Sequence, residues 1–120
     1  MSNERGLSGG VQVALLFPVA FSVLLLALQW AFVSWADATA LAAAQDGARV
    51  AAGFEGNADA GDQVASEAAD NGSLTAMTVY VQRGAVLTTV TVSGRSVSVV
   101  PGWAPLVTKS AEFPTERLTR

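Results

Sequence analysis

Hydrophobic and polar positions follow three different patterns along this chain. No charged residue occurs from Gly6 to Ala36. After that stretch, small and charged residues recur at helical spacing up to about residue 70, and from residue 77 apolar and polar residues alternate with the period of a strand. We therefore predict an α+β fold, in which a long helix and a short helix precede a small antiparallel sheet of three to four strands.

The apolar run at residues 13–35 predicts a single membrane-spanning helix. A helix needs about 20 apolar residues to cross roughly 30 Å of hydrocarbon, and this run is apolar on every face. Pro18 cannot donate a backbone hydrogen bond, so we expect a kink or a local loosening there. Trp30 and Trp35 suit the lipid–water boundary. Membrane lipid is the first partner that the sequence implies.

Two polar side chains, Ser22 and Gln29, lie within this run. Single polar groups are tolerated in a membrane helix, and they also form contacts between helices. Both explanations stay open, and Ser22 and Gln29 are the candidate helix–helix contacts.

A cleaved signal peptide is the main alternative to a membrane anchor. Arg5 could form its basic start, and residues 36–38 (Ala-Asp-Ala) could form its cleavage site. The apolar core of a signal peptide has roughly 7–15 residues, whereas this run is longer and ends in two tryptophans. We therefore expect an anchor.

Residues 1–12 form a short leader that contains three glycines. Glycine is a poor helix former, so we expect the leader to fray and to be accessible to a protease. Arg5 is the only basic residue before the apolar run, and it has Glu4 beside it. The positive-inside rule places the N-terminus in the cytoplasm and the C-terminal part outside the membrane.

Residues 36–53 are predicted to extend the helix into water. Alanine is abundant here, Asp46 and Arg49 can pair on one face, and Gly53 is a suitable stop. One narrow apolar stripe should pack on the following domain or on a neighbouring helix; it consists of Leu41, Ala44, Ala48 and Ala51.

Residues 54–114 are predicted to form the folded domain outside the membrane. It begins with a helix at residues 58–70, capped by Asn57 or Asp59. The other face of this helix is acidic, and we interpret it as solvated because its spacing matches no calcium-binding loop.

A β-hairpin is predicted to follow, with strands at residues 77–82 and 86–93. A shorter apolar piece lies at residues 97–100, a last strand runs from residue 106 to 112, and residues 115–120 form a flexible tail.

Composition narrows the functional classes. The chain has 120 residues, a net charge of −3, and neither cysteine nor histidine. It therefore lacks thiolate chemistry and the commonest general base, and its acidic balance disfavours nucleic acid. Lys109 and Ser110 would point to opposite faces of a strand. We expect no enzyme activity, no cofactor, no metal and no small-molecule substrate.

Three segments, taken together, resemble the TadE-like family of minor pilins from bacterial tight-adherence (Flp) pilus systems. The family typically has Arg-Gly, a few small residues, then Val-Glu-x-Ala-Leu and a nearby proline. The first segment is Glu4–Gly6 followed by Val11–Pro18, the second is the Gly-Ala-Arg-rich Ala44–Ala52, and the third is the Thr/Val-rich strand region that ends near Phe113–Arg117. The resemblance covers the first 52 residues well and the rest loosely.

The resemblance implies a pilin-like fold and a structural or assembly role in an adhesive pilus or a related secretion apparatus. It implies a single-pass protein of the bacterial cytoplasmic membrane, with pilin-like subunits, the pilus machinery and a prepilin peptidase as partners. The peptidase would cut after Gly6, with Leu7 and Gly10 as alternatives, or not at all. Gln12 stands where the family often has glutamate, but it is uncharged and one residue further from Gly6 than usual.

A second function remains in competition with this one. The same pattern suits a generic single-pass membrane-anchored binding or scaffold module outside the membrane.

Overall fold

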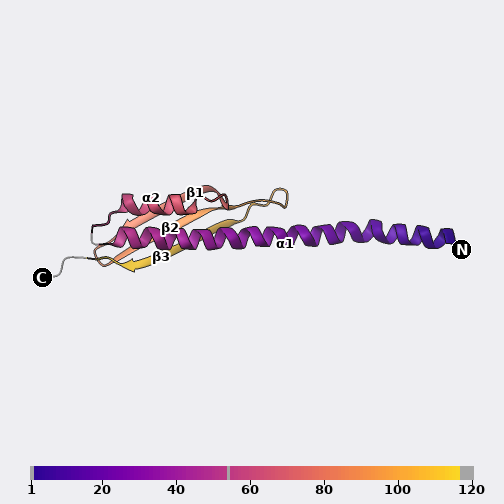
Figure 1. Cartoon of the computed structure of the whole chain (residues 1–120), viewed down its shortest axis with the longest axis horizontal. Helices are drawn as coiled ribbons and strands as arrows, with labels where there is room; N and C mark the ends of the chain where they lie inside the picture. Colours follow the sequence, from indigo (N-terminus) through magenta and orange to yellow (C-terminus); the bar gives the residue numbers. More distant parts are fainter. Residues whose placement is uncertain (1, 54, 117–120) are drawn as a thin grey trace.

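The computed structural model describes residues 2–53 and 55–116 and confirms the α+β fold, with three strands (Figure 1). The molecule is a long rod with a domain at one end, with extents of 92 × 21 × 16 Å. Its elements are α1 (Ser2–Ala52), α2 (Ala58–Ala69), β1 (Leu74–Arg83), β2 (Leu87–Ser96) and β3 (Leu106–Pro114).

Helix α1 is continuous over 51 residues and already begins at Ser2. The prediction that the leader frays is therefore wrong, because the helix continues through it. Adding residues to an existing helix costs far less free energy than starting a new helix. The helix also passes through Pro18, which lies inside it. The hydroxyl of Ser22 donates to the carbonyl of Pro18 at 2.7 Å, one turn back along the helix.

The three strands form an antiparallel meander in the order β1-β2-β3. The inner face of β2 carries Val90 and Val92, both fully buried. Its outer face is lined with hydroxyl groups, and Thr91 bonds to Ser110 of β3 at 2.8 Å. The alternation in the sequence thus correctly identified the two faces of the hairpin.

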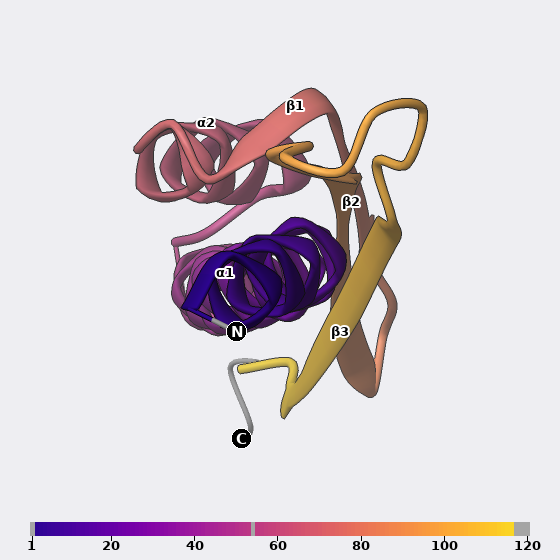
Figure 2. The same ribbon diagram turned by 90° about the vertical axis from the view of Figure 1, so that its right-hand side faces the viewer.

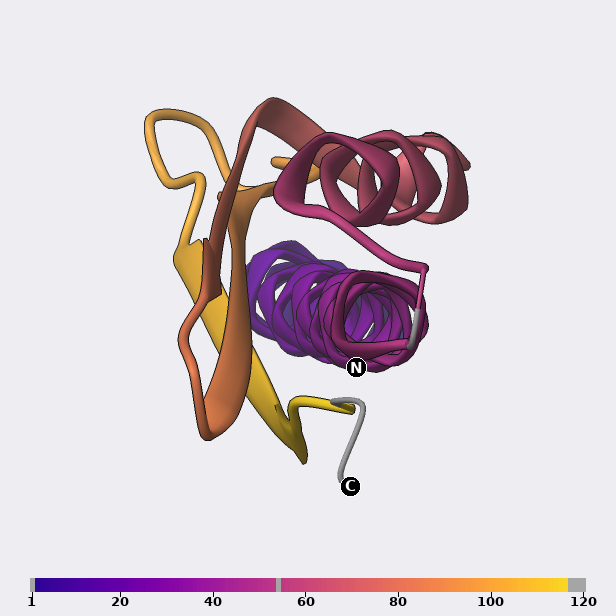
Figure 3. The same ribbon diagram turned by 90° about the vertical axis from the view of Figure 1, so that its left-hand side faces the viewer.

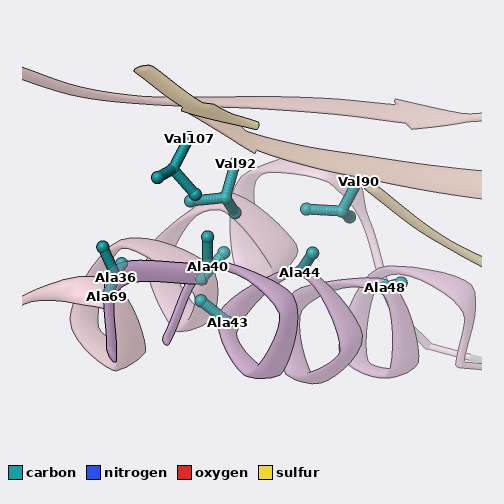
Figure 4. Close-up of a cluster of buried hydrophobic side chains, with 10 residues drawn as sticks. Ala36, Ala40, Ala43, Ala44, Ala48, Ala69, Val90, Val92 and Val107 are labelled. Atoms are coloured by element: carbon teal, nitrogen blue, oxygen red, sulfur yellow. The ribbon is translucent and has the colours of Figure 1, made fainter. Parts of the chain in front are cut away.

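The folded domain packs against the C-terminal half of α1 only, and leaves part of its surface exposed. Helix α2 lies along one side of α1, and the sheet covers another side (Figures 2 and 3). The core contains valines from the sheet that point at alanines of α1 (Figure 4). The buried apolar residues of α1 are Ala36, Ala40, Ala43, Ala44, Ala48, Ala51 and Ala52.

The predicted stripe on this half of α1 was partly wrong. Leu41 is exposed, whereas Ala44, Ala48 and Ala51 are buried as expected. The space between α1 and its neighbours is narrow, so the covered face is lined with alanine and glycine and the bulkier leucine points away from it.

Two glycines allow the close approach of α1 and α2. A Cβ atom on Gly61 would lie 2.6 Å from the Cβ of Ala51, and one on Gly47 would lie 2.8 Å from the Cβ of Ala65. Real Cβ atoms do not approach so closely, so any side chain at either position would push the helices apart.

The ends of the elements agree with the sequence at some points and differ at others. Helix α1 stops before Gly53, and the side chain of Asn57 caps α2 by accepting from the amide of Ala60 at 2.8 Å. Residues 97–100 form no strand but part of a loop.

The predicted flexible tail, residues 115–120, begins with two residues that are held in place. The amide of Thr115 donates to the carbonyl of Val86, and that of Glu116 donates to the carbonyl of Ala52, both at 2.8 Å. Residues 117–120 lie outside the described part of the chain.

Candidate functional site: the uncovered half of the first helix and the loop at its base

Exposure divides α1 into two parts. Among residues 9–28, every side chain is exposed except that of Leu25, which is half-buried, whereas Gln29 is only 1% exposed. We call residues 9–28 the uncovered half and residues 29–52 the covered half. The apolar part of the uncovered half, Val11–Leu28, is about 18 residues and roughly 27 Å long at 1.5 Å per residue.

This length matches the roughly 30 Å of hydrocarbon in a bilayer. The helix is long and apolar enough to cross a membrane, and its most apolar window is not buried at all. Its outward surface carries large side chains, and the rings of Phe17 and Phe21 stack with their centroids 6.1 Å apart. One long apolar helix of this kind suggests a single-pass membrane anchor.

The amide of Gln29 joins α1 to the loop between β2 and β3. Its nitrogen donates to the carbonyl of Val97 at 2.9 Å and, at 3.4 Å, to the hydroxyl of Ser96. Its oxygen accepts from the amides of Val99 at 2.9 Å and Val100 at 3.2 Å. The hydrogen-bonding capacity of the side chain is therefore used within the chain.

Gln29 was a candidate for a contact with a neighbouring helix, and in this structure its amide bonds within its own chain instead. The amide is buried under its own chain, so a contact with a second helix would require these bonds to open. Ser22 is exposed on the uncovered half, with its hydroxyl bonded to Pro18. A helix–helix contact at Ser22 stays a prediction.

The loop also encloses an apolar pocket against α1. The pocket has a volume of about 320 Å³, and its walls are almost entirely apolar. Its lining residues are Leu26, Gln29, Trp30, Val33, Trp103 and Pro105. Sequence reasoning missed this site, although the uncharged run from Ser96 to Thr108 was a visible signal.

The candidate processing positions lie at the end of α1 remote from the domain (Figure 1). Gly6 and Leu7 belong to the first turns of the helix, and Gly10 and Gln12 are exposed further along it. A Cβ atom on Gly10 would meet nothing within 4 Å. All four residues belong to one continuous helical segment, and cleavage there stays a prediction.

Several charged and hydroxyl groups of α1 and the domain have structural partners. Lys109 lies 3.2 Å from the carboxylate of Asp37 on α1, and Ser110 bonds across the outer face to Thr91. Lys109 and Ser110 therefore point to opposite faces, as predicted. Asp46 and Arg49 pair loosely at 4.0 Å. Among the described residues, no group of acidic side chains has the arrangement of a metal site.

Comparison with known proteins agrees with the resemblance seen in the sequence. No curated protein and no solved structure matches the chain. The family model described as TadE-like protein matches residues 11–49. The match covers the apolar part of the uncovered half and most of the covered half, so this segment of the chain is similar to TadE-like proteins.

Proposed function

We propose that this protein is a membrane-anchored, pilin-like structural or assembly component of a tight-adherence-type pilus or a related secretion apparatus. The TadE-like match supports an association with the Tad pilus. The uncovered half of α1 is the observation that carries the proposal. Its large apolar side chains have no cover from residues 9–53 and 55–116, whose burial the structure describes, and lipid or the helices of other subunits would bury them.

The proposed location is the bacterial cytoplasmic membrane, with the N-terminus in the cytoplasm and the folded domain outside. The apolar span and Arg5 support this orientation. Cleavage by a signal peptidase at residues 36–38 fits poorly. Ala36 is fully buried, Asp37 pairs with Lys109, and a cut there would also remove Gln29 from its loop.

The proposed role is structural rather than catalytic. The chain has no histidine or cysteine, and the two nucleophile candidates Lys109 and Ser110 are engaged on opposite faces of β3. We propose that lipid, pilin-like subunits and the pilus machinery are the partners, and that none of them is a small molecule or a nucleic acid.

Crosslinking in the native host tests this function. The chain contains no cysteine, so Ser22→Cys places one thiol on the uncovered half. Under oxidation, with single cysteines introduced into the candidate pilin-like subunits, we expect disulfide-linked products of Ser22→Cys. The matched control is Thr78→Cys on exposed β1. If Ser22→Cys yields no more product than the control, the protein acts as a generic membrane-anchored module instead.

The intact mass of the protein from its native membrane tests the processing. A loss equal to residues 1–6, 1–7 or 1–10 would establish cleavage after Gly6, Leu7 or Gly10. The full-length mass would show that this protein acts without removal of its leader.

A further inference from the structure

The loop between β2 and β3, residues 97–105, is apolar and well ordered by its own hydrogen bonds. It contains no charged residue. The hydroxyl of Ser98 lies 2.8 Å from the carbonyl oxygen of Val100 and 2.7 Å from that of Trp103, and its one hydrogen bonds to either. The amide of Ser96 donates to the carbonyl of Pro105 at 3.0 Å. The loop therefore presents a fixed surface.

This loop lies directly beside the end of the uncovered half. Gln29 bonds to three of its backbone groups, and the pocket joins Trp103 to Leu26 and Trp30. Figure 1 shows the loop extending along α1, past the ends of the strands, toward the N-terminus. If hydrocarbon covers Val11–Leu28, the loop stands at the edge of the bilayer.

The side chains at this level suit that edge better than they suit water. Trp103 is 48% exposed although it belongs to a folded loop, and Trp30 of α1 is also exposed. Tryptophan is enriched where lipid headgroups meet the acyl chains. The nearest charged residue before the loop is Arg95, which donates to the carbonyl of Ala104 at 2.8 Å.

We infer that the loop at residues 97–105 is a second membrane contact, which inserts Trp103 into the headgroup–acyl boundary while a lipid chain fills the pocket beside Trp30. The inference rests on the part of the proposed function in which α1 spans the membrane. With two contacts, the domain sits at a fixed height and in one orientation on the bilayer. Extraction of a subunit into a filament must then remove the loop from lipid as well as the helix.

Depth-dependent fluorescence quenching of the full-length protein in phosphatidylcholine–phosphatidylglycerol vesicles tests this contact. The substitutions Trp30→Phe and Trp35→Phe leave Trp103 as the only tryptophan, and Trp35→Phe with Trp103→Phe leaves Trp30. The matched control replaces all three tryptophans by phenylalanine and adds Val86→Trp. Val86 is 66% exposed in the turn at the opposite end of the hairpin.

Acyl chains brominated near the headgroup should quench Trp103 about as strongly as Trp30, and at least ~3-fold more than the Val86→Trp variant, because interfacial insertion reaches about 5–10 Å into the boundary. Iodide dissolved in the water should quench the Val86→Trp variant more strongly than it quenches Trp103 or Trp30. Quenching of Trp30 without that of Trp103 would overturn the loop contact and leave the span intact. Quenching of neither would overturn the span as well. Protection of Trp103 from both quenchers would place it against protein and overturn the contact.

Discussion

The two halves of α1 belong to one continuous helix but carry opposite kinds of side chain. The uncovered half is lined with leucine, valine and phenylalanine, all exposed except the half-buried Leu25. The covered half presents alanine and glycine to α2 and the sheet. Both surfaces are apolar, so hydrophobicity alone does not distinguish them.

Side-chain size is what separates the two halves. Large apolar groups are useful where fluid lipid, or another helix, can adapt to their shape. Small groups are needed where a fixed neighbour lies close, because protein interiors are packed as densely as crystals. Gly47 and Gly61 mark the point of closest approach. The change from large to small residues therefore locates the place where the domain begins to cover the helix.

The largest effect should come from adding volume to the covered half. Gly61→Val would force its side chain against Ala51 and against the carbonyl of Gly47, which lies 2.8 Å from a Cβ at this position. We expect the free energy of unfolding of the domain to fall by about 3 kcal/mol. Urea denaturation in detergent micelles, with the unfolding monitored by amide hydrogen exchange in β2, measures this free energy.

The control for this prediction is the same substitution in the uncovered half. A Cβ atom on Gly9 would meet nothing within 4 Å, so Gly9→Val should leave the domain unchanged. Equal losses in the two variants would refute the division of the helix.

A smaller effect should follow from removing the hydrogen bonds of Gln29, which lies where the uncovered half meets the covered half. Gln29→Leu keeps the volume but leaves the carbonyl of Val97 and the amides of Val99 and Val100 without their partner. We expect a local cost of about 2 kcal/mol, which corresponds to ~30-fold faster exchange of the loop amides. Gln45→Leu, on an exposed face of the covered half, is the control. Unchanged exchange in Gln29→Leu would show that the loop does not depend on this amide.

The smallest effect concerns the ion pair between the covered half and β3. The side chains of Asp37 and Lys109 are partly exposed, and their charged groups lie 3.2 Å apart. A double-mutant cycle with Asp37→Asn and Lys109→Met should therefore give a coupling energy of about 0.5 kcal/mol, and added salt should reduce it. The more exposed Asp46–Arg49 pair, at 4.0 Å, should give less. A stronger coupling for that pair would contradict the structure.

Local signals in the sequence predicted the elements well. The period-two alternation identified the inner face of the hairpin, and Asn57 was one of two proposed caps for α2. These features depend on neighbours within a few residues, which the sequence displays directly. The apolar run likewise predicted the helix, because length and hydrophobicity are sufficient for that.

Long-range partners could not be predicted in the same way. In an alanine-rich helix every face is similarly apolar, so the sequence could not show that Ala36 and Ala40 are buried while Leu41 is exposed. The amide of Gln29 can bond to any polar group, and its actual partners lie 67 to 71 residues further along the chain. Neither hydrophobic periodicity nor secondary-structure propensity predicts that the loop at residues 97–105 packs against α1.

Thiol accessibility along α1 tests the central claim most directly. The chain has no cysteine, so single cysteines can be introduced at Ser22 in the uncovered half and at Gln45 in the covered half, both exposed in the structure. In sealed vesicles with the domain outside, a membrane-impermeant maleimide should label Gln45→Cys readily and Ser22→Cys at least ~100-fold more slowly, because hydrocarbon surrounds the latter. Equal labelling of the two thiols would contradict the account.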